Sequence, residues 1–213
     1  MGYDISRRVV PAVAVPRLTL YLRKLQELEA QGVTRVSSRD LADLVGFNAA
    51  QIRKDLSYLG EFGTRGVGYE VARLVEEIDH CLGLDREWHV VIVGAGLLGT
   101  ALARYRGFAQ QGFRLVGIFD VSDVVVGTGQ GDGTVRSIDE LEALCRRQRV
   151  DIALVTVPAS AAEATIARLG AAGVRAILNF APIKVLSPKG VIVRQVDLSS
   201  ELMSLTYYLQ GEA

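Results

Sequence analysis

The stretch HVVIVGAGLLG, residues 89–99, decides the fold class of the C-terminal two thirds of this chain. After its histidine come four consecutive β-branched residues, as is typical of a strand buried on both faces of a parallel sheet. Three glycines follow at the spacing GxGxxG, and residues 101–103, which favour a helix, come soon after them. The sequence therefore predicts a buried strand, a tight turn and a helix in direct succession.

The turn has the form of a dinucleotide-binding loop. Gly94 would make the tight turn, Gly96 would let the backbone approach a pyrophosphate, and Gly99 would let the helix pack closely on the strand. The start of the helix then favours the anion. The residues expected to line this part of the site are Gly94, Ala95, Gly96, Leu97, Leu98 and Gly99. The alternative is a nucleotide-free α/β sheet in which the glycines are incidental.

A second predicted strand, residues 115–119, ends in an acidic residue, Asp120, twenty-one residues after Gly99. In a dinucleotide site an acid at this place binds the adenine ribose hydroxyls. It also repels a 2′-phosphate, so the sequence favours NAD⁺ and NADH over their phosphorylated counterparts.

The remaining elements complete a doubly wound sheet. We expect a short strand at residues 134–135 and longer ones at 151–157, 176–180 and 191–196, with capping boxes at 137–140 and 160–163 opening two helices. Ligands bind outside the carboxyl ends of such strands. The candidates to face a nicotinamide are Thr156, Pro158, Asn179, Ala181 and Pro182. These residues equally fit ordinary strand-ending turns.

The N-terminal third predicts three helices. The first covers residues 16–30, with leucines on one face. The second follows an N-cap at Ser37 and is expected to turn Leu41, Leu44 and Val45 inward. The third begins with a capping box at residues 48–51. Its predicted inner face consists of Ala49, Ile52, Leu56 and Leu59.

The opposite face of the third helix carries small residues and cations, which lets a helix approach a DNA groove and meet phosphates or base edges. Its candidate contacts are Ala50, Gln51, Arg53, Lys54, Ser57 and Tyr58. Two helices joined by a short turn form the DNA-reading helix-turn-helix, but also an ordinary helical hairpin. Residues 60–69, GEFGTRGVGY, predict a hairpin with Arg65 at its tip, which favours a winged helix over a flexible linker. Arg65 would then probe the adjacent phosphates or minor groove.

These elements predict an α/β protein with an N-terminal winged helix-turn-helix domain, a doubly wound parallel-sheet Rossmann domain and a C-terminal helix. The expected ranges are 1–83 for the DNA-binding domain, 84–198 for the NAD(H)-binding domain and 199–213 for the helix. Packing of this helix on its own domain is the default interpretation. Its apolar surface is larger than one face needs, which also fits a dimer contact.

The composition excludes several classes of protein. The 213 residues are 49% hydrophobic and 23% charged, which excludes disordered and fibrous chains, and two cysteines are too few for a disulfide framework or a zinc site. The longest uncharged run, residues 90–103, is shorter than the ~20 residues of a membrane span, so we expect a cytoplasmic protein without membrane or metal partners. The 24 basic and 24 acidic residues balance over the whole chain, but residues 1–69 contain 10 basic and 7 acidic residues. The neutral total therefore does not exclude DNA binding.

The sequence offers no recognisable apparatus for catalytic proton transfer. No tyrosine has a lysine four residues on, His80 and His89 lie away from the predicted ligand edge, and Cys145 is expected to be an inert, half-buried thiol. We therefore expect no enzyme, but a protein for which the dinucleotide is a signal. Two alternatives remain: an NAD-dependent oxidoreductase with a helical cap domain, and a CoA- or nucleotide-diphosphate-binding module, against which Asp120 argues.

From residue 16 to residue 210 the chain resembles the Rex family, the redox-sensing transcriptional repressors of bacteria. The resemblance is carried by QIRKDLSY at residues 51–58, GTRGVGY at 63–69, the loop at 94–99 and ILNFAP at 177–182. It implies a homodimer with a domain-swapped last helix. It also implies binding to a palindromic operator, an inverted repeat in double-stranded DNA, and release when NADH replaces NAD⁺.

The resemblance further implies a switch made of Arg23, Tyr105 and Asp197, whose polar contacts distinguish the DNA-binding arrangement from the NADH-bound one. Tyr105 would also line the nicotinamide pocket. The chain departs from the family at residues 121–135, where glycines at 127, 129, 131 and 133 predict a looser loop, and at Leu198, where an aromatic residue can occur. These departures bear on cofactor affinity and on the redox response.

Overall fold

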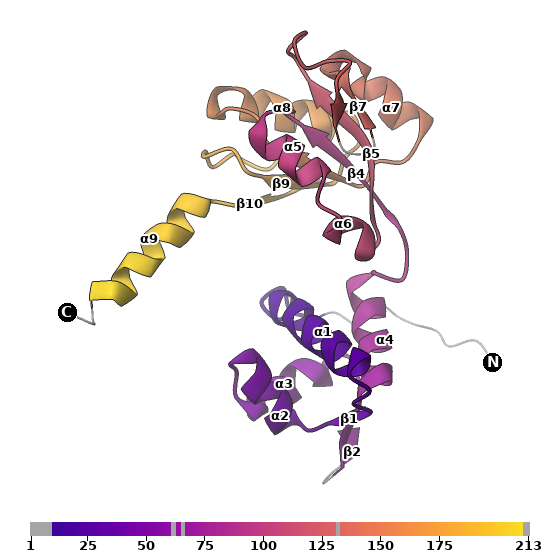
Figure 1. Cartoon of the computed structure of the whole chain (residues 1–213), viewed down its shortest axis with the longest axis vertical. Coiled ribbons are helices and arrows are strands. Elements are labelled where there is room, and N and C mark those ends of the chain that lie inside the picture. The colour runs from indigo at the N-terminus through magenta and orange to yellow at the C-terminus, as the bar shows by residue number, and fades with distance from the viewer. Residues whose placement is uncertain (1–9, 61–62, 65–66, 131–132, 211–213) are drawn as a thin grey trace. The chain divides into compact units, whose positions relative to one another are not determined.

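The chain folds into two compact units, residues 1–86 and residues 87–213, in a computed structural model (Figure 1). The structure describes residues 10–60, 63–64, 67–130 and 133–210. The chain passes from the first unit to the second in the connection between the helix that ends at Leu82 and the strand that begins at Trp88. The domain boundary expected after residue 83 lies in this same connection.

The N-terminal unit combines helices with a small antiparallel sheet (Figure 1). Its elements are α1 Val15–Ala30, β1 Arg35–Val36, α2 Ser38–Val45, α3 Ala49–Ser57, β2 Gly63–Thr64, β3 Gly68–Glu70 and α4 Val71–Leu82. The strand order is β1-β3-β2, and both strand pairs are antiparallel. A helix-turn-helix followed by such a hairpin is a winged helix, and this prediction is confirmed.

Helix α3 lies with one face in the core of this unit. Ile52, Leu56 and Leu59 are buried, as predicted from the helical period. Leu44, which was predicted to point inward, is 47% exposed. The short helix α2 buries Leu41 and the residue next to it instead.

The C-terminal unit is a doubly wound sheet in the order β10-β9-β8-β4-β5-β7-β6, parallel except for the β7–β6 pair. Its elements are β4 Trp88–Val93, α5 Leu97–Ala103, α6 Gly107–Gln110, β5 Phe113–Asp120, β6 Gly129–Gln130, β7 Gly133–Ser137, α7 Leu141–Arg147, β8 Ile152–Val155, α8 Ala159–Ala171, β9 Ala176–Asn179, β10 Ile192–Gln195 and α9 Leu198–Leu209. Helices α7 and α8 pack on one face of the sheet, and α5 and α6 on the other. The predicted fold class is confirmed.

Two helices of this unit begin differently from the predicted capping boxes. Helix α8 starts directly after Pro158 without a side-chain cap, so Ser160 lies inside its first turn. The hydroxyl of Ser137 accepts a hydrogen bond from the backbone of a 3₁₀ turn, Ile138–Glu140, which precedes α7. Pro158 stands at the N-cap of α8 and has no side-chain oxygen that could accept a hydrogen bond from the helix.

The glycine-rich stretch predicted as a loose loop contains a hairpin. Gly129 pairs with Thr134 and Gln130 with Gly133, and β7 extends to Ser137 beyond the two residues predicted. Gly131 lies outside the described residues. The added strand places an antiparallel edge on the parallel sheet.

Helix α9 is exposed along its whole length, and none of its residues is buried by the described part of the chain. Four leucines form a stripe along it: Leu198, Leu202, Leu205 and Leu209. Each is more than half exposed, from 56% to 69%. The default interpretation, in which this helix packs on its own domain, is therefore wrong for the single chain.

Candidate dinucleotide site and nucleic-acid interface

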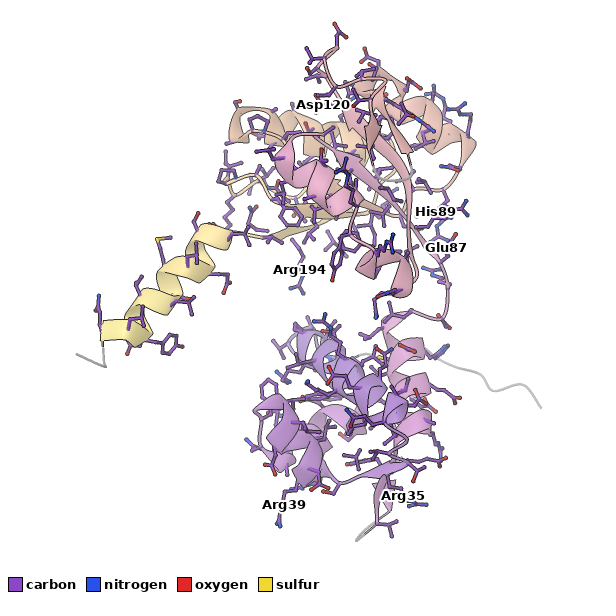
Figure 2. The ribbon with its side chains drawn as sticks, in the orientation of Figure 1. Arg35, Arg39, Glu87, His89, Asp120 and Arg194 are labelled. Atoms are coloured by element: carbon purple, nitrogen blue, oxygen red, sulfur yellow. The ribbon has the colours of Figure 1, made fainter. Side chains whose placement is uncertain are left out.

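The carboxyl ends of four parallel strands bring most of the predicted cofactor residues, though not Tyr105, into one row. Val93 of β4 pairs with Phe119 of β5 on one side and with Val155 of β8 on the other, and Val155 pairs with Asn179 of β9. Because these strands are parallel and in register, the residues that follow them lie at one edge of the sheet. Those residues are Gly94, Asp120, Thr156 and Phe180. Figure 2 shows Asp120 at this edge and His89 near the start of β4.

The glycine loop after β4 has the geometry that a bound pyrophosphate requires. Gly94 has a φ of +103°, and a Cβ there would lie 2.7 Å from the carbonyl oxygen of Thr156. A Cβ at Gly99 would overlap the carbonyl oxygen of Gly94, so only glycine lets α5 pack this closely. A Cβ at Gly96 would meet no described atom within 4 Å. The open side of Gly96 therefore leaves room for a ligand beside the first N–H groups of α5, which lack partners within the helix.

Asp120 is hydrogen-bonded to the glycine loop. Its Oδ2 accepts from the N–H of Ala95 at 2.6 Å, and its Oδ1 accepts from the N–H of Ser122 at 2.9 Å. An ionised carboxylate has about four acceptor positions, so these two bonds fix its orientation and leave capacity for ribose hydroxyls. The residues present fit the adenosine half of NAD(H).

Thr156 and Pro158 lie at the end of β8. The Thr156 hydroxyl donates to the carbonyl oxygen of Gly94 at 2.7 Å, which holds the ends of β4 and β8 together. Pro158 is exposed and directly precedes α8. Of these two predicted contacts, Pro158 is the more exposed, whereas Thr156 is half-buried.

Asn179 is fully buried and shapes the turn that follows β9. Its Nδ2 donates to Oε1 of Gln195 at 2.8 Å and to the carbonyl oxygen of Ile183 at 3.2 Å, while its Oδ1 accepts from the N–H of Ala181 at 3.1 Å. These bonds occupy both amide hydrogens. Asn179 thus fixes the turn that contains Ala181 and the exposed Pro182. Its own side chain is directed into the protein.

Helix α3 presents most of its predicted contacts to solvent. Ala50, Arg53, Lys54 and Ser57 are exposed, and Gln51 and Tyr58 are half-buried. Oδ1 of Asn48 accepts from the N–H of Gln51 at 2.8 Å, which fixes the start of the helix. Nη1 of Arg53 donates to Oγ of Ser38 at 3.0 Å and links α3 to α2. Lys54 forms no ion pair with any described residue, which leaves it available to a phosphate.

A fully buried carboxylate, Asp55, connects α3 to α1. It accepts from Nε and Nη2 of Arg17 at 2.6 and 2.8 Å, and from the hydroxyl of Tyr21 at 2.8 Å. Nε2 of Gln51 also donates to it at 2.8 Å, in place of the return bond of the predicted capping box. Burial alone would raise the pKa of Asp55, but the hydrogen bonds from Arg17, Tyr21 and Gln51 outweigh it and lower the pKa. Sequence reasoning missed this network because Asp55 appears as one more polar residue on a short helix.

Arg65, the predicted residue of the wing tip, lies outside the described residues. Two exposed arginines of the same unit were not among the predicted contacts: Arg35 in β1 and Arg39 in the first turn of α2. Figure 2 shows both side chains pointing away from the unit. The signal that indicates them is their position on either side of Ser37, the N-cap of the first helix of the helix-turn-helix.

The three switch residues implied by the resemblance lie on separate elements. Arg23 is exposed on α1 in the N-terminal unit. Tyr105, 55% exposed, packs edge-on against Phe108 with ring centroids 5.1 Å apart. Asp197 caps α9, where its Oδ1 accepts two N–H bonds at 3.0 and 3.2 Å. Hydrogen bonds from the backbone and hydroxyl of Ser200 lower the pKa of Asp197.

The remaining histidines and cysteines of the described chain do not form a metal or catalytic site. Among the described residues no group of His, Cys, Asp and Glu could hold a metal ion, and no helix there is long and apolar enough to cross a membrane. Burial raises the pKa of the Cys145 thiol, which disfavours its nucleophilic thiolate. Nδ1 of His89 lies 2.9 Å from the carbonyl oxygen of Arg149, and Nδ1 of His80 lies 2.9 Å from Oδ2 of Asp85.

Comparison with known families gives one match in each unit. Residues 9–57 match a family model described as a putative DNA-binding protein N-terminus. Residues 85–183 match a model described as a CoA binding domain.

Curated relatives match over nearly the whole chain. The chain is 49% identical to the redox-sensing transcriptional repressor Rex of Roseiflexus sp. (strain RS-1), over 93% of this chain and 90% of the relative. It is 46% identical to the protein of the same name in Carboxydothermus hydrogenoformans, over 95% of this chain and 98% of the relative.

Solved structures agree with these relatives. RSP in complex with β-NAD⁺ and operator DNA matches with a TM-score of 0.91 and 39% identity, covering 96% of this chain and 94% of that one. RSP in complex with β-NADH matches with a TM-score of 0.87 and 38% identity, covering 96% of each chain. RSP is described as a Rex-family repressor.

Proposed function

The chain belongs to the Rex family of redox-sensing transcriptional repressors, and from this premise we propose how its residues bind DNA and sense NAD(H). As a member of that family it is a DNA-binding repressor with NAD⁺ and NADH as its cofactors. We assign operator binding to residues 1–83, cofactor binding to residues 84–198, and dimer formation to residues 199–213. Since operator DNA and the nucleotide pool meet in the cytoplasm, we place its action there.

The observation that carries the proposal is the glycine loop with Asp120 hydrogen-bonded to it. The open side of Gly96 admits the pyrophosphate, and Asp120 receives the adenine ribose hydroxyls. The nicotinamide half then extends along the strand ends towards Pro158 and Pro182. The full proposed cofactor set is Gly94, Ala95, Gly96, Leu97, Leu98, Gly99, Tyr105, Asp120, Thr156, Pro158, Asn179, Ala181 and Pro182, with Thr156 and Asn179 acting by positioning.

Helix α3 is the proposed recognition helix. Its small residues allow it to enter the major groove, and its cations meet phosphates or base edges. The proposed contacts are Ala50, Gln51, Arg53, Lys54, Ser57, Tyr58 and the wing residue Arg65. Arg35 and Arg39 extend the cationic surface of the same unit. Because Gln51 is hydrogen-bonded to Asp55, it also helps to position α3.

We propose that α9 packs against a second copy of the chain. Its leucine stripe has no partner within the described chain, and an inverted-repeat operator requires two recognition helices related by a two-fold axis. Two such helices fit consecutive major grooves when they lie about 34 Å apart. Exchange of α9 between the copies satisfies both requirements.

The redox response requires that the DNA-binding arrangement and the NADH-bound arrangement differ in their affinities for NADH and NAD⁺. Reduction removes the positive charge of the nicotinamide ring, and we propose that Tyr105 and the Asp197 carboxylate respond to that change. Arg23 would provide the contact from the DNA-binding unit. A 100-fold weakening of operator binding by NADH needs a coupling free energy of about 2.7 kcal/mol, which a few polar contacts supply.

The decisive experiment is a mobility shift on an inverted repeat that the protein itself has enriched from a randomised DNA pool. NADH and NAD⁺ are titrated separately at fixed salt, because affinities for DNA depend on salt concentration. We expect NADH to release the DNA and NAD⁺ to leave it bound. DNA binding that is indifferent to both nucleotides would contradict the proposed sensor.

Two other functions are distinguished by simple measurements. The CoA-binding-domain match of residues 85–183 favours a CoA ligand as the second candidate. Asp120→Ala should leave CoA binding nearly unchanged but should damage NADH binding, because CoA does not require the ribose contact. The further candidate, an oxidoreductase, requires turnover of NADH with a hydroxy or carbonyl substrate, and we propose that no such turnover occurs.

A further inference from the structure

Three arginines from different elements line one cavity in the C-terminal unit. Arg114 comes from β5, Arg136 from β7 and Arg147 from the end of α7, and the cavity has a volume of about 460 Å³. Val116 and Leu144 provide apolar lining, and Gln148 adds a side-chain amide. None of these residues belongs to the glycine loop or to the proposed cofactor and DNA contacts.

The charges around this cavity are poorly compensated. Neither Arg136 nor Arg147 forms an ion pair with any residue of the described chain. Arg114 has one acidic partner, Glu87, at 3.4 Å, and both side chains are more than half exposed, at 65% and 51%. Figure 2 shows Glu87 beside His89, near the start of β4. An exposed pair of this length contributes little, so the cavity carries an excess of positive charge.

Three arginines and no carboxylate line this open cavity, and such a lining suits a phosphate-bearing ligand. Each guanidinium presents paired N–H donors to two phosphate oxygens, and a pyrophosphate has enough oxygens for three of them. The volume also lies within the range of small-molecule sites. The apolar side provided by Val116 and Leu144 can hold an uncharged portion of the ligand.

We propose that this cavity is a second anion site, which binds a small molecule through a pyrophosphate group. Arg136 and Arg147 bind the phosphate oxygens directly, and Arg114 exchanges its weak contact with Glu87 for the ligand. The ligand is either inorganic pyrophosphate or the diphosphate of a nucleotide, since both present the same group. The site is separate from the dinucleotide loop and can be occupied at the same time.

The test is calorimetric titration of the full chain with sodium pyrophosphate, with and without saturating NADH. We expect binding that NADH leaves unchanged. Arg136→Gln and Arg147→Gln should each weaken it about tenfold, as loss of a charged hydrogen bond does, and the double variant about 100-fold. Arg146→Gln is the matched control, because Arg146 is an exposed neighbour in α7 that does not line the cavity. Retained NADH binding by each variant checks its fold.

The outcomes separate the sources of the anion. ADP that binds more tightly than pyrophosphate, with the same dependence on Arg136 and Arg147, supports a nucleotide ligand, and equal affinities support recognition of the pyrophosphate group alone. Pyrophosphate binding that NADH abolishes and the double variant keeps would place the anion in the glycine loop and overturn the proposal. Absence of binding at about 10 mM pyrophosphate would also overturn it. The proposal would also be overturned if the wild type binds no pyrophosphate and the double variant loses operator affinity, because the arginines would then bind DNA phosphates.

Discussion

Arg17 of α1 and Asp55 of α3 form a two-point ion pair, with N···O distances of 2.6 and 2.8 Å. The Asp55 side chain is completely buried, and that of Arg17 is 22% exposed. Such a pair fixes both the spacing and the rotation of the two helices, because paired N–H donors meet paired oxygens in one orientation. The angle at which α3 would enter a DNA groove is therefore set by a pair whose carboxylate is buried in the core and whose guanidinium is partly exposed.

Removal of single members of this network should destabilise the N-terminal unit to graded extents. Tyr21→Phe removes one hydrogen bond to Asp55 and should cost about 1 kcal/mol. Asp55→Asn removes the charge that holds Arg17 and should cost about 3 kcal/mol. Native-state hydrogen exchange of the α1 and α3 amides measures both losses within the full chain. Asp43→Asn, at an exposed position of α2, is the control and should change neither helix. Equal exchange in Asp55→Asn and Asp43→Asn would contradict the role assigned to the pair.

The same network predicts how stability depends on pH. The pKa of Asp55 is lowered in the folded unit, so its stabilising contribution is complete above the unfolded value of about 4 and is lost as the pH falls through the folded pKa. The wild type should therefore lose stability below about pH 4 more steeply than Asp55→Asn, which has no carboxylate at this position. Urea unfolding followed by circular dichroism at several acidic pH values measures the two slopes. Parallel slopes would show that other carboxylates dominate acid unfolding.

Local patterns predicted the cofactor loop and the wing, whereas contacts between distant segments could not be predicted. The spacing of Gly94, Gly96 and Gly99 encodes a turn and a close packing within one short segment, so the sequence alone indicates their roles. Asp55 acquires its role from Arg17, which lies 38 positions away. In the same way, α9 shows its periodic leucines in the sequence, but their partner is not a neighbouring segment of the chain.

Lys54→Ala should weaken operator binding about tenfold and leave NADH affinity unchanged. Lys54 is exposed on α3 and has no ion pair within the described chain, so its loss removes a phosphate contact without disturbing the core. The slope of log K against log salt should fall by about 1, as expected for one phosphate contact. Lys24→Ala is the control, because Lys24 lies on α1 and is paired with Glu27. Loss of NADH binding in Lys54→Ala would contradict the division of labour between the units.

Substitutions at two glycines of the loop should separate folding from cofactor binding. Gly96→Ala adds a Cβ into open space, so the unit should melt near the wild-type temperature while NADH binding is strongly reduced. Gly99→Ala places its Cβ on the carbonyl oxygen of Gly94, so it should destabilise the unit itself. Thermal melts paired with NADH fluorescence titration distinguish the two effects. Gly129→Ala, which also adds a Cβ into open space but lies outside the loop, is the control and should change neither the melting temperature nor NADH affinity. Wild-type NADH affinity in Gly96→Ala would contradict the proposal that the pyrophosphate lies against Gly96.

A charge in the leucine stripe of α9 should convert a dimer into monomers. Leu205 lies in the middle of the stripe and is 56% exposed in the single chain. Covering such a leucine by a second copy contributes about 2 kcal/mol per side chain, and an aspartate at this position would bury an unpaired charge instead. Leu205→Asp should therefore sediment as a monomer at concentrations where the wild type is dimeric, and operator binding should fall with it, because two α3 helices are needed for an inverted repeat. Ser204→Asp adds the same charge to the helix away from the stripe and should remain dimeric. A dimer that survives in Leu205→Asp would show that α9 is not the element that joins the two copies.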